Sequence, residues 1–273
     1  MSRIEARFKA LRASRRKALI PYVTAGDPRP GFTVPLLHGL VDAGADIVEI
    51  GVPFSDPIGD GPVIQMACER ALAHHIGLDD VLAMVRDFRS RDADTPVVLM
   101  GYMNPIEVMG HRRFADEAAA AGVDGVLTVD MPPEEMGDFS DCLAAAGLDP
   151  IFLIAPTTTE ERIRLICDNA RGFVYYVSLK GVTGADTMDV DTVAGRVDSI
   201  HAVTGLPVGV GFGISSPEKA AKMSRASDAV IVGSVLVRRI AEHGGDDEST
   251  LRDVTGLLRA MREAMDTEAE VPA

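Results

Sequence analysis

Short apolar runs alternate with longer segments of helical spacing along the whole chain. The runs are rich in Val, Ile and Leu and occupy residues 18–24, 46–50, 96–101, 125–129, 150–155, 174–178, 207–212 and 229–233. Because they are apolar without strict alternation, they are typical of parallel strands that are covered on both faces. The helical segments lie at 30–43, 62–74, 78–91, 111–121, 133–146, 159–169, 189–203, 216–225, 234–242 and 250–266. This alternating order indicates a parallel α/β domain.

Glycines punctuate the ends of several predicted helices. Gly44, Gly122 and Gly147 occur in the similar stretches DAGAD, AAGVD and AAGLD, where each can adopt the left-handed conformation just past a helix. Eight strand and helix units in roughly 250 residues match a (β/α)8 TIM barrel with extra N-terminal and C-terminal helices. An open doubly wound sheet is the alternative, because the pattern alone does not show whether the sheet closes. We expect residues 1–267 to form this single domain and 268–273 to be a disordered tail.

The amino-acid composition and net charge exclude some classes of binding partner. The chain has 273 residues, of which 47% are apolar, and its formal net charge is −14. Nucleic acids and anionic membrane surfaces require clustered positive charge, so neither is an expected partner. Three cysteines lie far apart with no CxxC pair, and no set of His, Cys or acidic residues has metal-ligand spacing. We therefore expect a cytoplasmic protein with no membrane span, no metal and no bound organic cofactor.

Glycine clusters follow the last three predicted strands. The stretches GVTG, GFGISS and VGS place backbone N–H groups where they can approach an anion, and a serine can cap the helix that begins near Pro217. Loops after the seventh and eighth strands of such barrels frequently bind phosphate. Ordinary structural turns are the alternative. The candidate phosphate ligands are Gly184, Gly213, Gly233 and Ser234.

Two carboxylates carry the candidate chemistry. Glu49 interrupts the apolar run DIVEIG, where burial can raise its pKa towards neutrality and suit it to both giving and taking a proton. A structural carboxylate bonded to a neighbouring strand is the alternative. Asp60 follows in a Gly- and Pro-rich loop long enough to belong to an active site, although an isolated loop acid or a helix cap has the same pattern. For Asp56, within SDP, we expect a turn or a contact role.

Several motifs together resemble the tryptophan synthase alpha subunit family, from Phe8 to the last helix. They are VEIGVPFSDPIGDGP at 48–62, GDP at 26–28, YMNP at 102–105, GVTG at 181–184 and GFGIS at 211–215. The resemblance implies a (β/α)8 barrel that cleaves indole-3-glycerol phosphate to indole and glyceraldehyde 3-phosphate. It also implies that indole passes to a pyridoxal-phosphate beta subunit, in an α2β2 complex that makes tryptophan.

The resemblance assigns roles to individual residues. Glu49 is implied as the acid/base that protonates indole C3, and Asp60 as the carboxylate that binds the ring N–H. Tyr175 is implied beside Glu49, and Thr183 in a loop that closes towards Asp60. Apolar side chains that can form a slot for a flat ring, or merely barrel core, are Tyr22, Ile64, Met100, Leu127 and Phe212. Residues implied at the interface with the beta subunit are Pro53, Asp56, Pro57 and Asn104.

Two alternatives remain open. Where the family often has Arg, this chain has Leu179 and Lys180, and Lys180 suggests a Schiff-base aldolase acting on a sugar phosphate. The chain can also act chiefly as an allosteric partner, through loops at 53–60 and 102–108. In that case its exposed contact residues would be Pro53, Phe54, Pro57, Met103 and Ile106.

Overall fold

The eight predicted strands form a closed parallel barrel. The computed structural model describes residues 1–178, 190–211, 213–243 and 246–269. Each strand pairs with the next along the chain, and β8 pairs with β1, so the open sheet is excluded. The strands are β1 Ala18–Thr24, β2 Val48–Gly51, β3 Val97–Gly101, β4 Gly125–Thr128, β5 Asp149–Ile154, β6 Val174–Val177, β7 Val208–Gly211 and β8 Ala229–Val232.

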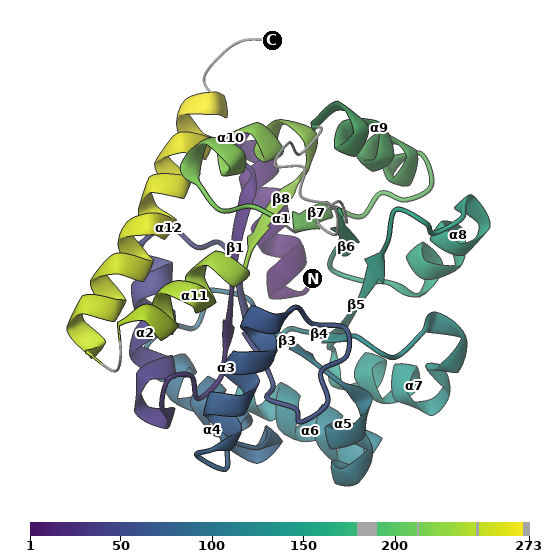
Figure 1. The fold of residues 1–273 in the computed structure, drawn as a ribbon. Helices are drawn as coiled ribbons and strands as arrows, with labels where there is room; N and C mark the ends of the chain where they lie inside the picture. The colour runs from purple at the N-terminus through teal and green to yellow at the C-terminus, as the bar shows by residue number, and fades with distance from the viewer. Residues whose placement is uncertain (179–189, 212, 244–245, 270–273) are drawn as a thin grey trace.

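Helices surround the barrel (Figure 1). The first half of the chain contributes α1 Arg3–Ala13, η1 Pro30–Phe32, α2 Thr33–Asp42, α3 Pro62–Leu72, α4 Leu78–Arg89, α5 Met103–Met109 and α6 His111–Ala121. The second half contributes η2 Pro133–Glu135, α7 Gly137–Ala146, α8 Glu160–Asn169, α9 Val190–His201, α10 Pro217–Ala226, α11 Ser234–Glu242 and α12 Asp247–Ala269. Predicted and observed helices agree closely. Residues 270–273 of the predicted tail lie outside the described residues, whereas α12 continues through Ala269.

One helix was missed by the sequence pattern. The segment 102–108 was expected to be a loop, but it contains α5, which follows β3 directly. Tyr102 is its extended N-cap, and Gly110, with φ of +89°, ends it. A helix this short shows too few turns to display a hydrophobic period, which explains the error. The helix-ending role of Gly44, Gly122 and Gly147 is confirmed, because all three have positive φ.

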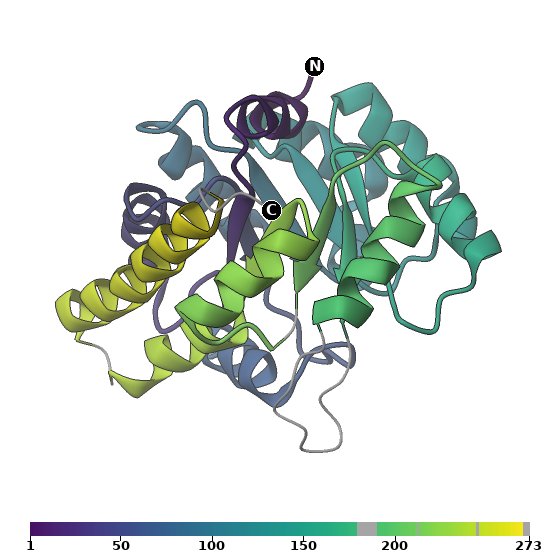
Figure 2. The same cartoon turned by 90° about the horizontal axis from the view of Figure 1, so that it is seen from above.

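The interior of the barrel is closed at one end by α1. Ile4, Phe8 and Leu11 of this helix are buried in one cluster with inward side chains of the strands. Figure 2 shows α1 across one end of the barrel. Towards the other end this cluster is topped by partly buried side chains, namely Met100, Val129, Leu153 and Tyr175. The helix α1 therefore closes the amino-terminal end of the barrel, and the carboxyl ends of the strands remain available for a site.

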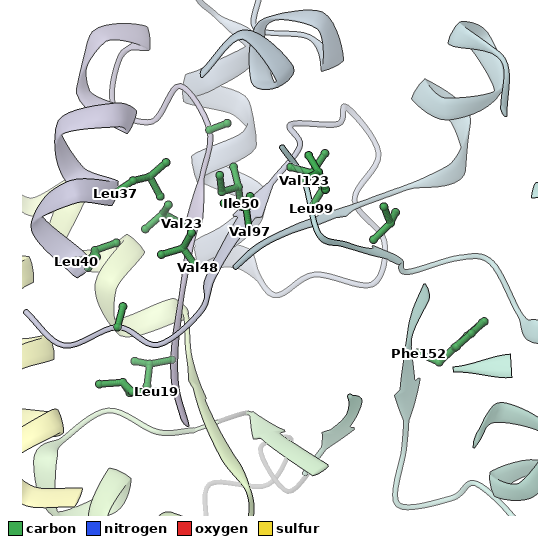
Figure 3. Close-up of a cluster of buried hydrophobic side chains, with 14 of the residues drawn as sticks. Leu19, Val23, Leu37, Leu40, Val48, Ile50, Val97, Leu99, Val123 and Phe152 are labelled. Atoms are coloured by element: carbon green, nitrogen blue, oxygen red, sulfur yellow. The ribbon is translucent and has the colours of Figure 1, made fainter. Parts of the chain in front are cut away.

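A second apolar layer separates the strands from the outer helices. In Figure 3, Leu37 and Leu40 of α2 point towards the strands that carry Val23 and Val48. Strand residues that face this layer alternate with those that face the interior, so both faces of each strand are buried. This explains why the strand patterns are continuously apolar. Within the described part of the chain, no helix is long and apolar enough to cross a membrane.

Candidate active site

Glu49 is a buried acid on β2. Its side chain is 1% exposed, and its residue pairs in register with Tyr22 of β1 and Val98 of β3. Among the described residues, Glu49 Oε1 has no hydrogen-bond partner. Burial, and secondarily the charge of Asp60, raises the pKa of Glu49 to about 8. A structural carboxylate would have its oxygens paired with neighbouring donors, so the orphaned oxygen favours the acid/base interpretation.

Alternation along β2 places Glu49 on the inner face of the barrel, because its neighbours Val48 and Ile50 belong to the outer apolar layer. Tyr175 belongs to β6, which is not a neighbour of β2, yet the Glu49 carboxylate contributes to raising its pKa. Burial is the larger cause of that shift, and Asp60 adds to it. The three predicted catalytic residues therefore face one region inside the carboxyl end of the barrel.

Two strand glycines make room for the tyrosine hydroxyls. A Cβ placed on Gly51 would lie 2.0 Å from the Tyr22 hydroxyl oxygen, and one on Gly211 would lie 2.2 Å from that of Tyr175. Neither position can carry a side chain while these rings keep their places. Sequence reasoning missed both glycines. Their only signal was their position at strand ends, which many turn glycines share.

Asp60 is held by a network of hydrogen bonds in the loop between β2 and α3. Its Oδ2 accepts a 2.9 Å hydrogen bond from the Tyr102 hydroxyl, and its carbonyl oxygen accepts one of 2.9 Å from Gln65 Nε2. Its own N–H donates to the carbonyl oxygen of Pro57 at 3.0 Å. Burial raises the pKa of Asp60, and the Tyr102 hydrogen bond opposes that rise. Tyr102 was not among the predicted site residues, although it follows β3 immediately.

The apolar residues predicted to contact a flat ring come together only in part. Tyr22 and Ile64 belong to one small cluster with Cys68 and Val237, and Met100 packs against it. Leu127 instead lies in the inner barrel core below. Val129 and Leu153 share the upper edge of that core with Met100 and were not predicted. Phe212 lies outside the described residues.

The helices that follow β7 and β8 begin at Pro217 and Ser234, near the carboxyl ends of these strands, where a phosphate can bind. Ser216 is the N-cap of α10, and its side chain accepts a 3.3 Å hydrogen bond from the N–H of Lys219. Gly213 has φ of +73° and open space around it, which leaves its backbone accessible. Gly233 is the N-cap of α11, and Ser234 is the first residue of that helix. Gly184, Thr183, Leu179 and Lys180 lie outside the described residues.

The expected exposed contact residues are mostly buried. Pro53, Pro57, Met103 and Ile106 are all buried, so the expectation that they form an exposed patch is wrong. Phe54 is half-buried because its ring stacks on Tyr102, with centroids 5.2 Å apart. These apolar side chains pack on their own barrel, which removes them from water without a partner. The residues exposed in the same two segments are Ser55, Asp56, Ile58, Gly59, Asn104, Glu107 and Val108.

No group of three or more His, Cys, Asp or Glu side chains in the described residues could hold a metal ion. The described candidate site contains an acid with raised pKa, a second carboxylate, an apolar wall and two helix N-termini.

Comparisons with known proteins identify the family. The sequence model described as "Tryptophan synthase alpha chain" matches residues 8–266. The curated tryptophan synthase alpha chain of Thioalkalivibrio sulfidiphilus is 65% identical over 97% of this chain and 100% of its own length. That of Marinobacter nauticus is 61% identical over 98% of this chain and 99% of its own length. The crystal structure of the alpha subunit from Legionella pneumophila superposes with a TM-score of 0.92 at 47% identity, covering 98% of this chain and 99% of that one. The chain therefore belongs to the tryptophan synthase alpha chain family, whose members are carbon–carbon lyases that produce indole for a beta subunit.

Proposed function

We propose that this chain cleaves indole-3-glycerol phosphate by a retro-aldol reaction in which Glu49 is the acid/base and Asp60 the electrostatic partner. The observation that carries the proposal is the buried carboxyl of Glu49, whose Oε1 has no hydrogen-bond partner among the described residues and whose pKa of about 8 keeps it protonated at neutral pH. Indole is a poor leaving group until its C3 carbon is protonated, so the reaction needs such a proton donor.

The first step transfers the proton from Glu49 to indole C3. The ring becomes an indolenine cation, with its positive charge centred on the nitrogen, and Glu49 becomes a carboxylate. Asp60 then accepts a hydrogen bond from the ring N–H, which strengthens as the nitrogen becomes positive. This interaction stabilises the cation more than the neutral substrate and so lowers the barrier.

The second step breaks the carbon–carbon bond. The Glu49 carboxylate takes the proton of the side-chain hydroxyl next to the ring, and a carbonyl forms at that carbon. The electron pair of the cleaved bond returns to the ring and neutralises the indolenine. The products are indole and glyceraldehyde 3-phosphate, and Glu49 regains its proton for the next turnover. Tyr175 limits the space beside Glu49 to one orientation of the glycerol chain.

The phosphate is proposed to bind at the starts of α10 and α11. Gly213, Gly233 and Ser234 supply backbone N–H groups, and both helix dipoles favour an anion. Gly184, Thr183 and Phe212 complete the proposed contacts from their sequence positions. Binding through amides suits a chain of net charge −14, because it needs no cluster of cations.

The proposed partner is a pyridoxal-phosphate beta subunit, in an α2β2 complex that receives the indole. Asp56 and Asn104 are exposed and lie in the segments after β2 and β3. Ile58 and Val108, in the same segments, expose 87% and 84% of their surface, which is unusual for large apolar residues. Pro53 and Pro57 shape the loop that carries Asp56. The free cysteines Cys68, Cys142 and Cys167 suit the reducing cytoplasm in which we place the reaction.

The proposal is tested by mixing the purified chain with indole-3-glycerol phosphate and following the release of indole, with and without a tryptophan synthase beta chain. We expect indole and glyceraldehyde 3-phosphate in equal amounts, and faster release when the beta chain is present. If the Glu49→Gln variant released indole as fast as the native chain, the assignment of Glu49 as the acid/base would be refuted. Covalent trapping by borohydride in the presence of substrate would point instead to a Schiff-base lysine.

A further inference from the structure

Tyr102 joins the end of β3 to the loop that carries Asp60. Its hydroxyl donates a hydrogen bond to Asp60 Oδ2 and accepts one from the N–H of Gly59, both at 2.9 Å. Its ring stacks on Phe54 with an angle of 27° between the planes. A single side chain therefore contacts three positions of the loop between β2 and α3.

The tyrosine itself is firmly placed. It is 4% exposed, and it follows the last residue of β3. The next residue, Met103, donates its N–H to Asp130 Oδ1 at 2.8 Å, which anchors the start of α5 to the segment after β4. Since Tyr102 is anchored to the barrel and the loop is anchored to Tyr102, the position of the Asp60 carboxylate is set from β3.

We propose that Tyr102 is a positioning residue for the cleavage reaction: its hydroxyl orients the Asp60 carboxylate and favours its ionised form. This inference rests on the proposed function, because Asp60 must be ionised to stabilise an indolenine cation. A hydroxyl that donates to a carboxylate stabilises the charged form over the neutral one.

The surroundings of Asp60 make this hydrogen bond necessary. Burial raises the pKa of Asp60, and the hydrogen bond from Tyr102 is what lowers it. In the described part of the chain, the titratable groups that interact electrostatically with Asp60 are all acids: Tyr22 of β1, Glu49 of β2, Cys68 of α3, Tyr102 just after β3, and Tyr175 of β6. None of them can supply a positive charge, so without the Tyr102 hydroxyl the Asp60 carboxylate would lose its main stabilising contact.

The test is Tyr102→Phe, which removes the hydroxyl and keeps the ring that stacks on Phe54. The matched control is Tyr176→Phe, because Tyr176 is equally buried, lies in the outer apolar layer, and shows no effect of Asp60 on its pKa. The pKa of Asp60 is measured by NMR titration of the 13C-labelled carboxyl, assigned with Asp60→Asn. The pH dependence of kcat and KM for indole release is measured on the same variants.

We expect Tyr102→Phe to raise the pKa of Asp60 by about one unit, because the variant loses the hydrogen bond that stabilises the ionised carboxylate. The acidic limb of kcat should move up in pH by the same amount, and kcat at neutral pH should fall by about tenfold with KM changed less than about threefold. Tyr176→Phe should leave all three unchanged. An Asp60 pKa that stays in place in Tyr102→Phe would overturn the inference, as would an equal loss of activity in both variants.

The NMR titration separates failure of this inference from failure of the proposed function. If the chain releases no indole but the Asp60 pKa shifts, the link between Tyr102 and Asp60 stands and the proposed reaction is wrong. If the chain releases indole and the pKa does not shift, the reaction stands and the role of Tyr102 is wrong. A melting temperature within a few degrees of the native chain shows that the variant is folded.

Discussion

At the residue scale, the proposed chemistry is assigned to a single buried acid. Among the described residues Glu49 has no charged partner of opposite sign, and its ionised form is disfavoured by burial and by Asp60 together. The protein tolerates it because the neutral form predominates below a pH of about 8. Burial disfavours the ionised carboxylate, so Glu49 is a poor structural ion-pair partner. For the same reason it keeps its proton at neutral pH, which suits it to the proposed role of proton donor.

The rate of cleavage should therefore decline in alkaline solution. Glu49 must be protonated to begin the reaction, and its folded pKa is about 8. We expect kcat/KM for indole release to fall about tenfold for each unit of pH above that value. Steady-state assays between pH 6 and 10 measure this limb. A profile that stays flat to pH 10 would show that another group delivers the proton.

Glu49→Gln should strongly slow cleavage and change how stability depends on pH. The folded pKa is raised above the unfolded value of 4.5, so the native chain loses stability as pH rises from 4.5 through about 8. By this linkage the variant should gain roughly 3–5 kcal/mol relative to the native chain between pH 4.5 and 9. Cleavage should fall by about 10²–10⁴. Urea denaturation of both chains at pH 4.5 and pH 9 measures the change in stability, and phosphate binding checks that the site is intact. An equal pH dependence of stability in the two chains would contradict the prediction.

At the element scale, α12 is latched to the barrel by a buried ion pair. Arg262 donates from Nη1 to Asp46 Oδ2 at 3.1 Å and to the carbonyl oxygen of Lys17 at 2.9 Å. Asp46 also accepts a hydrogen bond of 2.9 Å from the N–H of Leu19 in β1. The latch therefore connects the last helix to the region where β1 and β2 begin. α12 also packs along α10, as Figure 1 shows.

Arg262→Met should destabilise the fold without touching the site. It leaves the Asp46 carboxylate buried without its cation, a change that typically costs about 3–5 kcal/mol. The control is Arg252→Met on the same helix, where an exposed pair with Glu248 contributes at most about 1 kcal/mol. Urea denaturation compares the two. Similar small losses in both variants would show that the latch contributes little.

At the scale of the whole molecule, barrel closure places separate segments at one end. The loop after β2 supplies Asp60, β6 supplies Tyr175, and the helices after β7 and β8 supply the proposed anion site. The opposite end is filled by α1 (Figure 2). Reaction chemistry and the exposed residues of the proposed interface thus share the carboxyl ends of the strands, where loops can vary without disturbing the core.

Val108→Asp should weaken binding of the beta subunit and leave the isolated chain active. Val108 and Asn104 lie one turn apart on α5 and share its exposed face. A charge there should raise the dissociation constant by about tenfold or more, equal to ~1.4 kcal/mol. Leu165→Asp on α8 is the control, because Leu165 is another exposed apolar residue outside the two interface segments. Titration calorimetry measures both. Unchanged affinity for Val108→Asp would remove α5 from the interface.

Local pattern was sufficient for most of the elements. The strand segments and the glycines that end α2, α6 and α7 follow from neighbouring residues along the chain. The short helix α5 did not, because its seven residues show no period. The burial of Pro53, Pro57, Met103 and Ile106 was also missed, since turn residues and apolar loop residues look the same whether they face water or their own barrel.

The sequence by itself determined the order of strands and helices, the acid within a strand and the glycines that follow the last strands, because each is a property of residues close together in the chain. Only the tertiary structure decided that the sheet closes, that Glu49 points inward towards Tyr175, and that Tyr102 holds Asp60. These depend on contacts between segments distant in sequence, such as the 42 positions that separate Tyr102 from Asp60. Such contacts are set by packing and register, which local pattern does not encode.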